Sequence, residues 1–168
     1  ATDDTAAGFA DVPADAYYAD AVAWAVEAGV TSGTSATAFS PDASVTRAQA
    51  VTFLWRAAGS PKPASLTSDF SDVTDPNAYY YQAVLWAAEQ GITNGTGDGV
   101  FGLDGTLPYD QILAFLCRAA GGDASGADWS EKALAWAAEN GLTDGLSFTA
   151  AGTCPRSDVV YCLWKQLA

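Results

Sequence analysis

The chain has 168 residues, 49% of them hydrophobic and 12% aromatic, which is enough apolar material for a folded core of one or two domains. Seven Lys and Arg residues stand against 20 Asp and Glu residues, and the net charge of -13 argues against nucleic acids and anionic membranes as partners, because both require a basic protein surface. The sequence contains no His and no Cys-x-x-Cys pair, so zinc binding and His-assisted nucleophilic catalysis are nearly excluded, and we expect no metal and no cofactor.

No apolar run approaches the length of a membrane span, no signal peptide is recognised, and Met is absent. We therefore expect no membrane insertion, and we interpret the sequence as a mature protein or as a fragment of a longer one.

The first predicted element is a helix over residues 18–28, and after a loop a second helix is expected over residues 46–58. Gly29 fits the left-handed backbone conformation that commonly closes a helix. Thr46, with Gln49 three residues later, predicts a capping box, in which the side chain of each residue bonds the backbone N–H of the other.

The same helix–loop–helix order returns twice. We expect further helices over residues 79–90, 108–120, 130–140 and 155–167. Gly91 and Gly141 stand where Gly29 stands in the first unit, as C-terminal caps. Pro108 and Pro155 suit the first turn of a helix, because the fixed φ and the missing N–H of proline are tolerated there.

The three units are copies of one sequence repeat. The segments "AVAWAVEAGVTSGT" from Ala21, "AVLWAAEQGITNGT" from Ala83 and "ALAWAAENGLTDGL" from Ala133 share a Trp, a Glu-x-Gly and the Thr and Gly that follow. Such self-similarity predicts an all-α fold built from three helix–loop–helix repeats. The repeats comprise residues 1–61, 62–121 and 122–168.

The first helix of each repeat is apolar on nearly every face. Around Trp24 only Asp20 and Glu27 are charged. A helix of this kind is normally buried on all sides, which a single pair of helices cannot achieve. We therefore expect the three first helices to pack together, as a central three-helix bundle, in one domain with pseudo-threefold symmetry. The chain is then a monomer with the form of a trimer.

Short motifs recur in register with these helices. The first two repeats open with Phe-x-Asp-Val, at Phe9 to Val12 and at Phe70 to Val73, and residues 91–101 form the loop "GITNGTGDGVF". The last helix of the first repeat begins with "TRAQ", where the second repeat has "PYDQ" and the third has "PRSD". Together these motifs resemble the S-layer homology domain, and the whole chain resembles a cassette of three such repeats.

The resemblance implies a non-catalytic anchoring module of an extracellular protein on the bacterial cell surface. Cassettes of this family bind secondary cell-wall polysaccharides, often through pyruvylated N-acetylmannosamine, in grooves between the repeats. The signature arginine of the family falls on Arg47 and Arg156, which are therefore the expected contacts to the acidic group of the sugar. Tyr109 occupies this place in the second repeat, so two active grooves are expected rather than three.

Arg47 also stands out on physical grounds. It is a cation at the start of a predicted helix, where the helix dipole makes a cation unfavourable by ~0.3–1 kcal/mol. An anionic ligand, held by the free amides of the first turn and by the guanidinium, would reverse that preference. The alternative is a surface arginine paired with a loop acid such as Asp42. Arg56, Arg118 and Lys165 lie near helix C-termini, where compensation of the dipole explains them.

The candidate groove further includes Asp11, Asp72, Tyr109, Thr46, Gln49, Trp24 and Trp86. Asp11 and Asp72 are expected to cap the turn that follows each of them, and the family pattern places this acid close to the groove. Trp24 and Trp86 recur in the middle of apolar helices, which favours core packing, with stacking on a sugar ring as the alternative.

Two further features predict local structure only. The segment "GTGDGVFGLDG" lacks the Lys of a phosphate loop and the acidic ladder of a calcium loop, and predicts a turn. Cys154 and Cys162 would lie about 12 Å apart along a helix, too far for a disulfide. Cys117 and Cys162 are expected to pack as small apolar residues, with a disulfide between the second and third repeats as the alternative.

Two other functions compete with anchoring. A glycoside hydrolase needs two carboxylates that face each other across a cleft, but the acids of this chain are scattered through loops and helix ends, so we do not expect an enzyme. The signature Glu of the family is replaced by Gln49, Gln111 and Asp158. This departure keeps open a protein-interaction module that binds a host protein or a neighbouring surface protein.

Overall fold

The computed structural model describes residues 9–31, 33–35, 37–93, 99–146 and 148–167, which fold into six helices. These are α1 (Ala19–Glu27), α2 (Arg47–Ala57), α3 (Tyr81–Glu89), α4 (Tyr109–Ala119), α5 (Trp129–Glu139) and α6 (Arg156–Leu167). The described residues form no strand, only three isolated β-bridges. The predicted all-α fold is confirmed, and each helix begins and ends within two residues of its expected bounds.

The helix ends follow the local sequence signals. At the start of α2 both halves of the capping box are present, because Thr46 Oγ1 accepts from the N–H of Gln49 and Gln49 Oε1 accepts from the N–H of Thr46. Gly29, Gly91 and Gly141 have φ of 78°, 73° and 73°, as expected of residues that close a helix. Pro108 was expected inside the first turn of α4 but stands one position earlier, at the N-cap.

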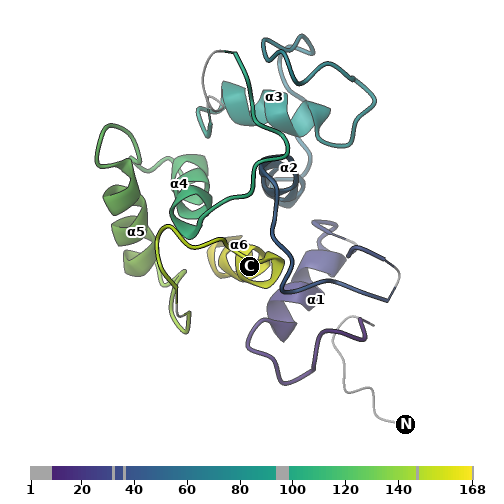
Figure 1. Cartoon of the computed structure of the whole chain (residues 1–168), viewed down its shortest axis with the longest axis vertical. Helices are drawn as coiled ribbons and strands as arrows, with labels where there is room; N and C mark the ends of the chain where they lie inside the picture. Colours follow the sequence, from purple (N-terminus) through teal and green to yellow (C-terminus); the bar gives the residue numbers. More distant parts are fainter. Residues whose placement is uncertain (1–8, 32, 36, 94–98, 147, 168) are drawn as a thin grey trace.

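The second helix of each repeat lies at the centre, and the first helices lie outside (Figure 1). The central helix α6 packs against both α2 and α4. Of the outer helices, α3 packs on α2, α5 packs on α4, and α1 packs on α6. Each first helix therefore contacts the second helix of the preceding repeat, and α1 closes the ring by contacting the last helix of the chain.

The expectation that the three first helices form the centre was wrong. Helix α1 exposes Ala23 and Val26, and in α5 only Ala133 and Ala137 are fully buried. By contrast, α6 buries a continuous run over residues 156–163. Alanine has little apolar surface and costs little to expose, whereas the bulky side chains of the second helices gain more free energy from burial.

Backbone hydrogen bonds join the start of each central helix to the loop of the following repeat. Two amides of its first turn donate to carbonyls of that loop, at distances of 2.8–3.3 Å. The pairs are Arg47–Gly105 and Ala48–Leu103 for α2, Tyr109–Gly152 and Asp110–Ala150 for α4, and Arg156–Ala43 and Ser157–Pro41 for α6. The last two pairs connect the third repeat to the first, so the contacts run in a closed ring.

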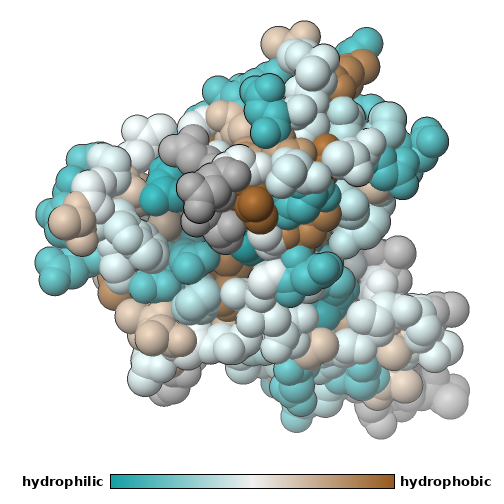
Figure 2. All heavy atoms as spheres, turned by 45° about the horizontal axis from the view of Figure 1, so that its top comes forward, coloured by the Kyte–Doolittle hydropathy of each residue, from teal (hydrophilic) through white to brown (hydrophobic). Residues whose placement is uncertain are grey.

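The cysteines lie in the apolar interior. Cys117, Cys154 and Cys162 are buried and free, and the predicted packing role of Cys117 and Cys162 agrees with the structure. Hydrophilic and weakly polar residues cover most of the face in Figure 2, with small apolar islands between them. None of the helices in the described part of the chain is long and apolar enough to cross a membrane.

Candidate ligand groove between repeats

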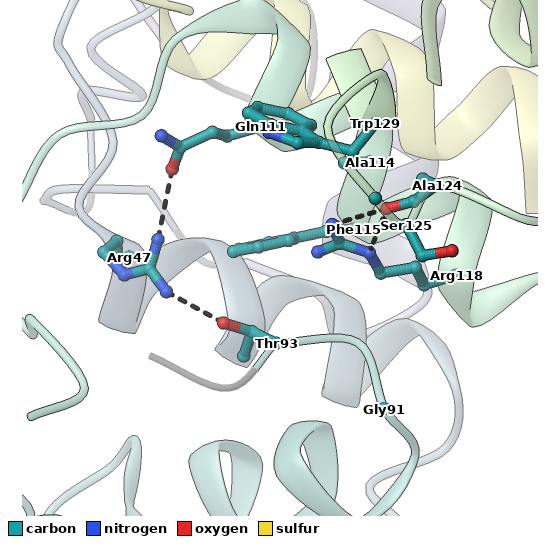
Figure 3. Close-up of a pocket in the computed structure, with 11 residues that line it drawn as sticks. Arg47, Gly91, Thr93, Gln111, Ala114, Phe115, Arg118, Ala124, Ser125 and Trp129 are labelled. Carbon is teal, nitrogen blue, oxygen red and sulfur yellow. Dashed lines mark hydrogen bonds between the residues drawn. The ribbon is translucent and has the colours of Figure 1, made fainter. Parts of the chain in front are cut away.

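Arg47 projects from the first turn of α2 into the second repeat. Only 6% of its surface is exposed. Its Nε donates to the carbonyl of Phe101 (3.0 Å), one terminal nitrogen donates to Gln111 Oε1 (3.1 Å), and the other donates to Thr93 Oγ1 (2.8 Å; Figure 3). The guanidinium carbon lies 5.1 Å from the ring centre of Phe101 and 5.4 Å from that of Phe115. Contacts to the next repeat thus fix the guanidinium in place.

A cavity of about 580 Å³, which we call groove A, opens beside this guanidinium. Gly91 and Thr93, from the loop of the second repeat, form one wall. Helix α4 contributes Gln111 and Arg118, and residues 124–126 with Trp129 form the opposite wall. Figure 3 shows Phe115 between the two arginines, with Trp129 above it and next to Gln111. None of the described residues that line the groove is acidic. The groove therefore combines two cations, a tryptophan and several neutral hydrogen-bonding groups.

The two arginines keep enough N–H groups to bind an anion. Burial lowers the pKa of Arg47, the charge of Arg118 lowers it further, and Asp72 opposes this effect. An arginine nevertheless stays charged at any physiological pH. A guanidinium has five N–H donors, and the three hydrogen bonds described for Arg47 use three of them. The remainder can serve a ligand in the groove.

Arg118 holds the second cationic position from the last turn of α4. Its Nε and one terminal nitrogen donate to the carbonyl of Ala124 (3.1 and 2.7 Å), and the other terminal nitrogen donates to the carbonyl of Ile92 (2.9 Å). The sequence explained Arg118 by the helix dipole alone. The structure shows that it also ties two walls of groove A together and contributes charge to the groove.

Arg156 repeats the environment of Arg47 between the third and first repeats. It is 4% exposed, its Nε donates to the carbonyl of Phe39 (2.9 Å), and a terminal nitrogen donates to Thr31 Oγ1 (3.1 Å). Its guanidinium carbon lies 5.1 Å from the ring centres of both Phe39 and Phe53. We call these four residues the Arg156 site. The surface ion pair considered for these arginines is not formed, because both salt bridges found in the described part of the chain involve Lys132.

The third equivalent position has no cation. The ring of Tyr109 stacks on Phe148, with ring centres 4.6 Å apart, and its hydroxyl donates to the carboxylate of Asp158. Tyr17 of the first repeat donates to the same carboxylate. Burial, followed by the hydrogen bond to Asp158, raises the pKa of both phenols. We call this cluster the Tyr109 interface. It contains a buried carboxylate, whereas groove A and the Arg156 site each have a buried guanidinium at the equivalent position.

The helix N-termini do not offer the free amides expected from the sequence. The first two amides of α2 donate to carbonyls of Gly105 and Leu103, and the corresponding amides of α6 donate to Ala43 and Pro41. Carbonyls of the neighbouring repeat thus already satisfy the donors that an anion would need. Arginine side chains, and not helix termini, carry the positive character of the groove.

Asp11 and Asp72 bind loops that are distant in sequence, and the expectation that they cap the following turn was wrong. Asp11 accepts from the amides of Phe39 and Ser40 (2.9 and 2.8 Å). Asp72 accepts from the amides of Phe101 and of the two residues after it (2.8, 2.8 and 3.3 Å). The carbonyls of the same two phenylalanines bind Arg156 and Arg47. Each acid therefore positions the loop that holds a candidate arginine.

The other predicted groove residues lie outside groove A. Thr46 and Gln49 form the capping box, and Trp24 and Trp86 are half-buried against the core, as the packing interpretation predicted. Trp129, which lines the groove, was not predicted from the sequence. One signal could have found it, because the repeat alignment places Trp129 in register with two aromatic residues, Tyr17 and Tyr79. Of the glycine-rich loop, residues 94–98, including Asp98, lie outside the described residues.

Comparison with known proteins gives the family. The family model of the S-layer homology domain matches residues 8–51 and 69–102. The chain is also 36% identical, over 163 residues, to a cell surface protein of Thermoanaerobacter kivui. The first two repeats belong to the S-layer homology family. The third repeat lies beyond the family match, but the alignment with the surface protein covers 95% of the chain, and the structure gives α5 and α6 the same arrangement as the earlier helix pairs.

Domains of the S-layer homology family are non-catalytic modules for anchoring at the cell surface, where they bind cell-wall polymers. A second relative is an endoglucanase of Bacillus sp. (strain KSM-635), 36% identical over 93 residues, or 55% of this chain. The chain spans 21% of the length of the surface protein and 10% of that of the endoglucanase. The likeness thus concerns one module of longer proteins, and indicates association with the cell surface.

Proposed function

We propose that this S-layer homology cassette anchors an extracellular bacterial protein by binding an anionic secondary cell-wall polysaccharide. The acidic group, such as the pyruvyl group of pyruvylated N-acetylmannosamine, would bind Arg47 in groove A and Arg156 at the Arg156 site. The observation that carries this proposal is the pair of guanidiniums in groove A, which have no acidic residue beside them among the described lining. A carboxylate ligand would supply a counter-charge inside the groove itself.

The Tyr109 interface would not take part. A negative ligand there would meet the carboxylate of Asp158, and the hydroxyls that could donate to the ligand already donate to this carboxylate. Two binding sites are therefore proposed, and the three repeats would work as one monomeric, pseudo-trimeric domain, because groove A uses residues of all three repeats and the Arg156 site uses residues of two. Two sites on one molecule would also allow one polymer strand to be held twice.

The proposal predicts that the loss of both arginines abolishes wall binding. Purified chain would be added to bacterial wall sacculi, before and after acid extraction of the secondary polymer. Replacing a charged hydrogen-bond donor costs about 1.5–3 kcal/mol, or roughly ten- to a hundredfold in affinity. We expect Arg47→Ala plus Arg156→Ala to bind extracted and unextracted walls equally weakly, whereas the unmodified chain sediments with unextracted walls only.

The matched control is Lys62→Ala plus Lys165→Ala, which removes the same charge from exposed positions outside groove A. It should bind like the unmodified chain. Arg47→Lys keeps the charge but loses the planar fork of donors, and should bind with intermediate affinity. Circular dichroism checks that each variant is folded. Wall binding that survives in the folded double arginine variant would refute the proposed sites. If the unmodified chain does not bind walls at all, a protein partner would be favoured instead.

A further inference from the structure

Two linkers of this chain fold back onto the helices that they connect. The linker of residues 59–68 leaves α2 and crosses the end of α3, which packs on α2. Trp55 of α2 donates through Nε1 to the carbonyl of Pro61 (2.7 Å). The carboxylate of Glu89, the last residue of α3, accepts from two consecutive amides of the linker, at positions 64 and 65 (2.9 and 3.0 Å). A tryptophan of one helix and a glutamate of the next thus hold the linker between them.

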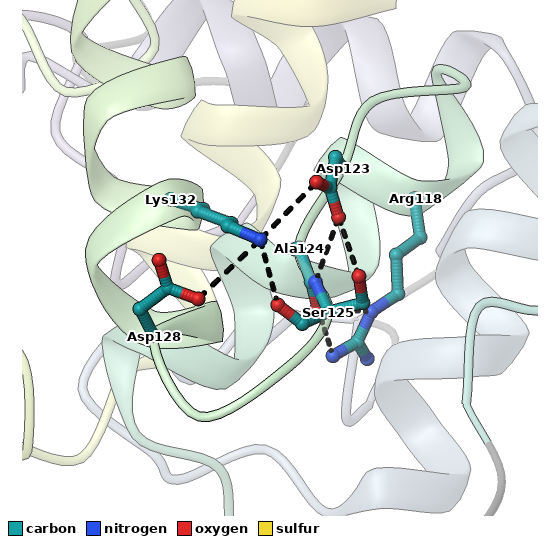
Figure 4. Close-up of polar contacts among 6 residues, drawn as sticks. All are labelled: Arg118, Asp123, Ala124, Ser125, Asp128 and Lys132. Atoms are coloured by element: carbon teal, nitrogen blue, oxygen red, sulfur yellow. Dashed lines mark hydrogen bonds and ion pairs between the residues drawn. The ribbon is translucent and has the colours of Figure 1, made fainter.

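The linker after α4 is shorter but is held from the same two sides (Figure 4). Arg118 of α4 donates twice to the carbonyl of Ala124 (3.1 and 2.7 Å). Lys132 of α5 donates to the carbonyl of Ser125 (3.0 Å) and pairs with the carboxylate of Asp123 (3.2 Å). Each linker therefore binds the second helix that it leaves and the first helix of the next repeat.

Helices α6 and α1 are the third pair of this kind, because α1 packs on α6. In the register of the repeats, Trp164 of α6 stands where Trp55 stands in α2, and Glu27 of α1 stands where Glu89 stands in α3. Trp164 is half-buried and Glu27 is exposed. Within the described part of the chain, no hydrogen bond involves the indole N–H of Trp164 or the carboxylate of Glu27. The two side chains that would hold a segment are present, and no described segment lies on them.

The place of Glu27 in its helix is unfavourable by itself. It is the last residue of α1, where the helix dipole disfavours an anion, and the last turn of α1 contains no basic residue. Glu89 has the same place in α3, and there two linker amides compensate the charge. Two amides of a further segment would give Glu27 the same compensation.

The two helices also expose apolar side chains near these positions. Val26 in α1 is 36% exposed and Leu167 in α6 is 45% exposed. The register of the repeats places alanine at each equivalent position of the other two repeats. The third pair thus exposes larger apolar side chains than alanine, and a segment that covers them would gain free energy from their burial.

We propose that Trp164, Leu167, Val26 and Glu27 form a docking site, the α6–α1 surface, for the polypeptide that follows the cassette in a longer protein. One carbonyl of that segment would accept from Trp164, and two consecutive amides would donate to Glu27. The related surface protein and endoglucanase are such longer proteins, since this chain spans 21% and 10% of their lengths. The docked segment would fasten the first repeat to the third and hold the start of the attached region against the cassette.

The test uses residues 59–68 of this chain as the probe, because they occupy the equivalent place beside α2 and α3. Ala168 is replaced by a copy of residues 59–68, so that the copy of Pro61 stands six residues after Trp164, the spacing that Pro61 has from Trp55. We expect the extended chain to melt about 2–4 °C higher than the unmodified chain. The NMR signal of the Trp164 indole N–H, assigned from Trp164→Phe, should move as well. An extension of the same length made of Gly and Ser should have neither effect.

Two variants show whether the gain comes from the proposed contacts. Trp164→Phe keeps an aromatic ring but removes the indole N–H, and Glu27→Gln removes the charged acceptor. Each should reduce the gain by half or more, measured against the same variant without the extension. Glu139→Gln is the matched control, because Glu139 is the exposed last residue of α5, outside the α6–α1 surface. It should leave the gain unchanged.

A copy of residues 59–68 that raises the melting temperature no more than the Gly and Ser extension would overturn the docking site. A gain that survives both Trp164→Phe and Glu27→Gln would do the same. A gain that grows with protein concentration would show that the segment docks on a second molecule, and would overturn docking within one chain. None of these outcomes affects the proposed wall binding, because Arg47 and Arg156 lie outside the α6–α1 surface.

Discussion

At the scale of single residues, Arg47 shows how tertiary contacts change the meaning of a sequence position. A cation at a helix start opposes the helix dipole. The structure offsets this cost without a ligand, because three hydrogen bonds and two aromatic rings from the second repeat hold the guanidinium. The position of Arg47 in its own helix is therefore not sufficient evidence for an anion. The stronger evidence is the second guanidinium of Arg118 in the same groove.

Asp72 allows a prediction at the same scale. Burial tends to raise the pKa of its carboxyl, but the hydrogen bonds from the amides of Phe101, Gly102 and Leu103 outweigh this effect and lower the pKa below the ordinary value of 3.8. A lowered pKa in the folded state means that the carboxylate stabilises the fold above pH 3.8, and that this contribution is lost as the pH falls through the folded pKa.

We therefore expect Asp72→Asn to lower the free energy of unfolding by about 1–3 kcal/mol at pH 7, since the amides lose a charged acceptor. The difference from the unmodified chain should shrink as the pH falls from 3.8 through the lower pKa of the folded state, below which both side chains are neutral. Urea denaturation at pH 7 and pH 3 measures both values. Asp69→Asn, an exposed acid nearby, is the control and should change little at either pH. An Asp72→Asn effect that does not depend on pH would contradict the assigned role.

At the scale of the helix, local sequence signals and packing contribute separately. Helix α2 begins with a full capping box, whereas the N-cap of α4 is Pro108, which has no side-chain cap. Both helices nevertheless have 11 residues and bury seven of them. Packing in the central layer therefore determines that a helix forms, and the cap adds stability at one end.

Removal of the cap should cost a modest amount. Thr46→Ala is expected to lower the free energy of unfolding by about 1 kcal/mol, since the N–H of Gln49 loses its acceptor. Gln49→Ala should cost a similar or smaller amount, because the N–H of Thr46 then depends on water. Chemical denaturation followed by circular dichroism gives both values. A Thr46→Ala loss above about 3 kcal/mol would show that Thr46 has a further role, beyond the cap.

At the scale of the whole molecule, the ring of contacts predicts that the repeats are not independent. Helix α1 packs on α6, so the first helix of the chain depends on the last. The loop carbonyls of Pro41 and Ala43 likewise bind the start of α6. Deletion of any one repeat would expose two apolar interfaces. It would also remove the loop carbonyls that accept hydrogen bonds from the first amides of a neighbouring helix, and these amides would be left without partners.

We expect a chain of residues 1–121, which lacks α5 and α6, to lose cooperative folding. Its circular dichroism should show a broad thermal transition, and its NMR spectrum should be poorly dispersed. Addition of the separate segment 122–168 should restore both signals, because the missing interfaces are then supplied in trans. A sharp unfolding transition for residues 1–121 alone would instead show that the first two repeats form a domain of their own.

The sequence by itself determined the parts that depend on neighbouring residues. The six helices, their order, the capping box at Thr46 and the closing glycines were all predicted, because apolar periodicity, N-caps and left-handed glycines act within a few positions of the chain. The repeat motifs also pointed to Arg47 and Arg156. The structure places both in the same kind of buried setting, beside a phenylalanine carbonyl and a threonine hydroxyl of the following repeat.

Only the tertiary structure decided which helices occupy the centre and which side chains meet in groove A. The apolar composition of the first helices predicted a central position for them. Burial of alanine contributes little free energy, however, so the second helices, with their bulkier side chains, lie at the centre. Arg118 and Trp129 line the same groove as Arg47 because α5 packs on α4 and because the start of α2 contacts the loop of the second repeat. Such contacts depend on the complementarity of surfaces that are distant in sequence, and a local sequence pattern does not predict that complementarity.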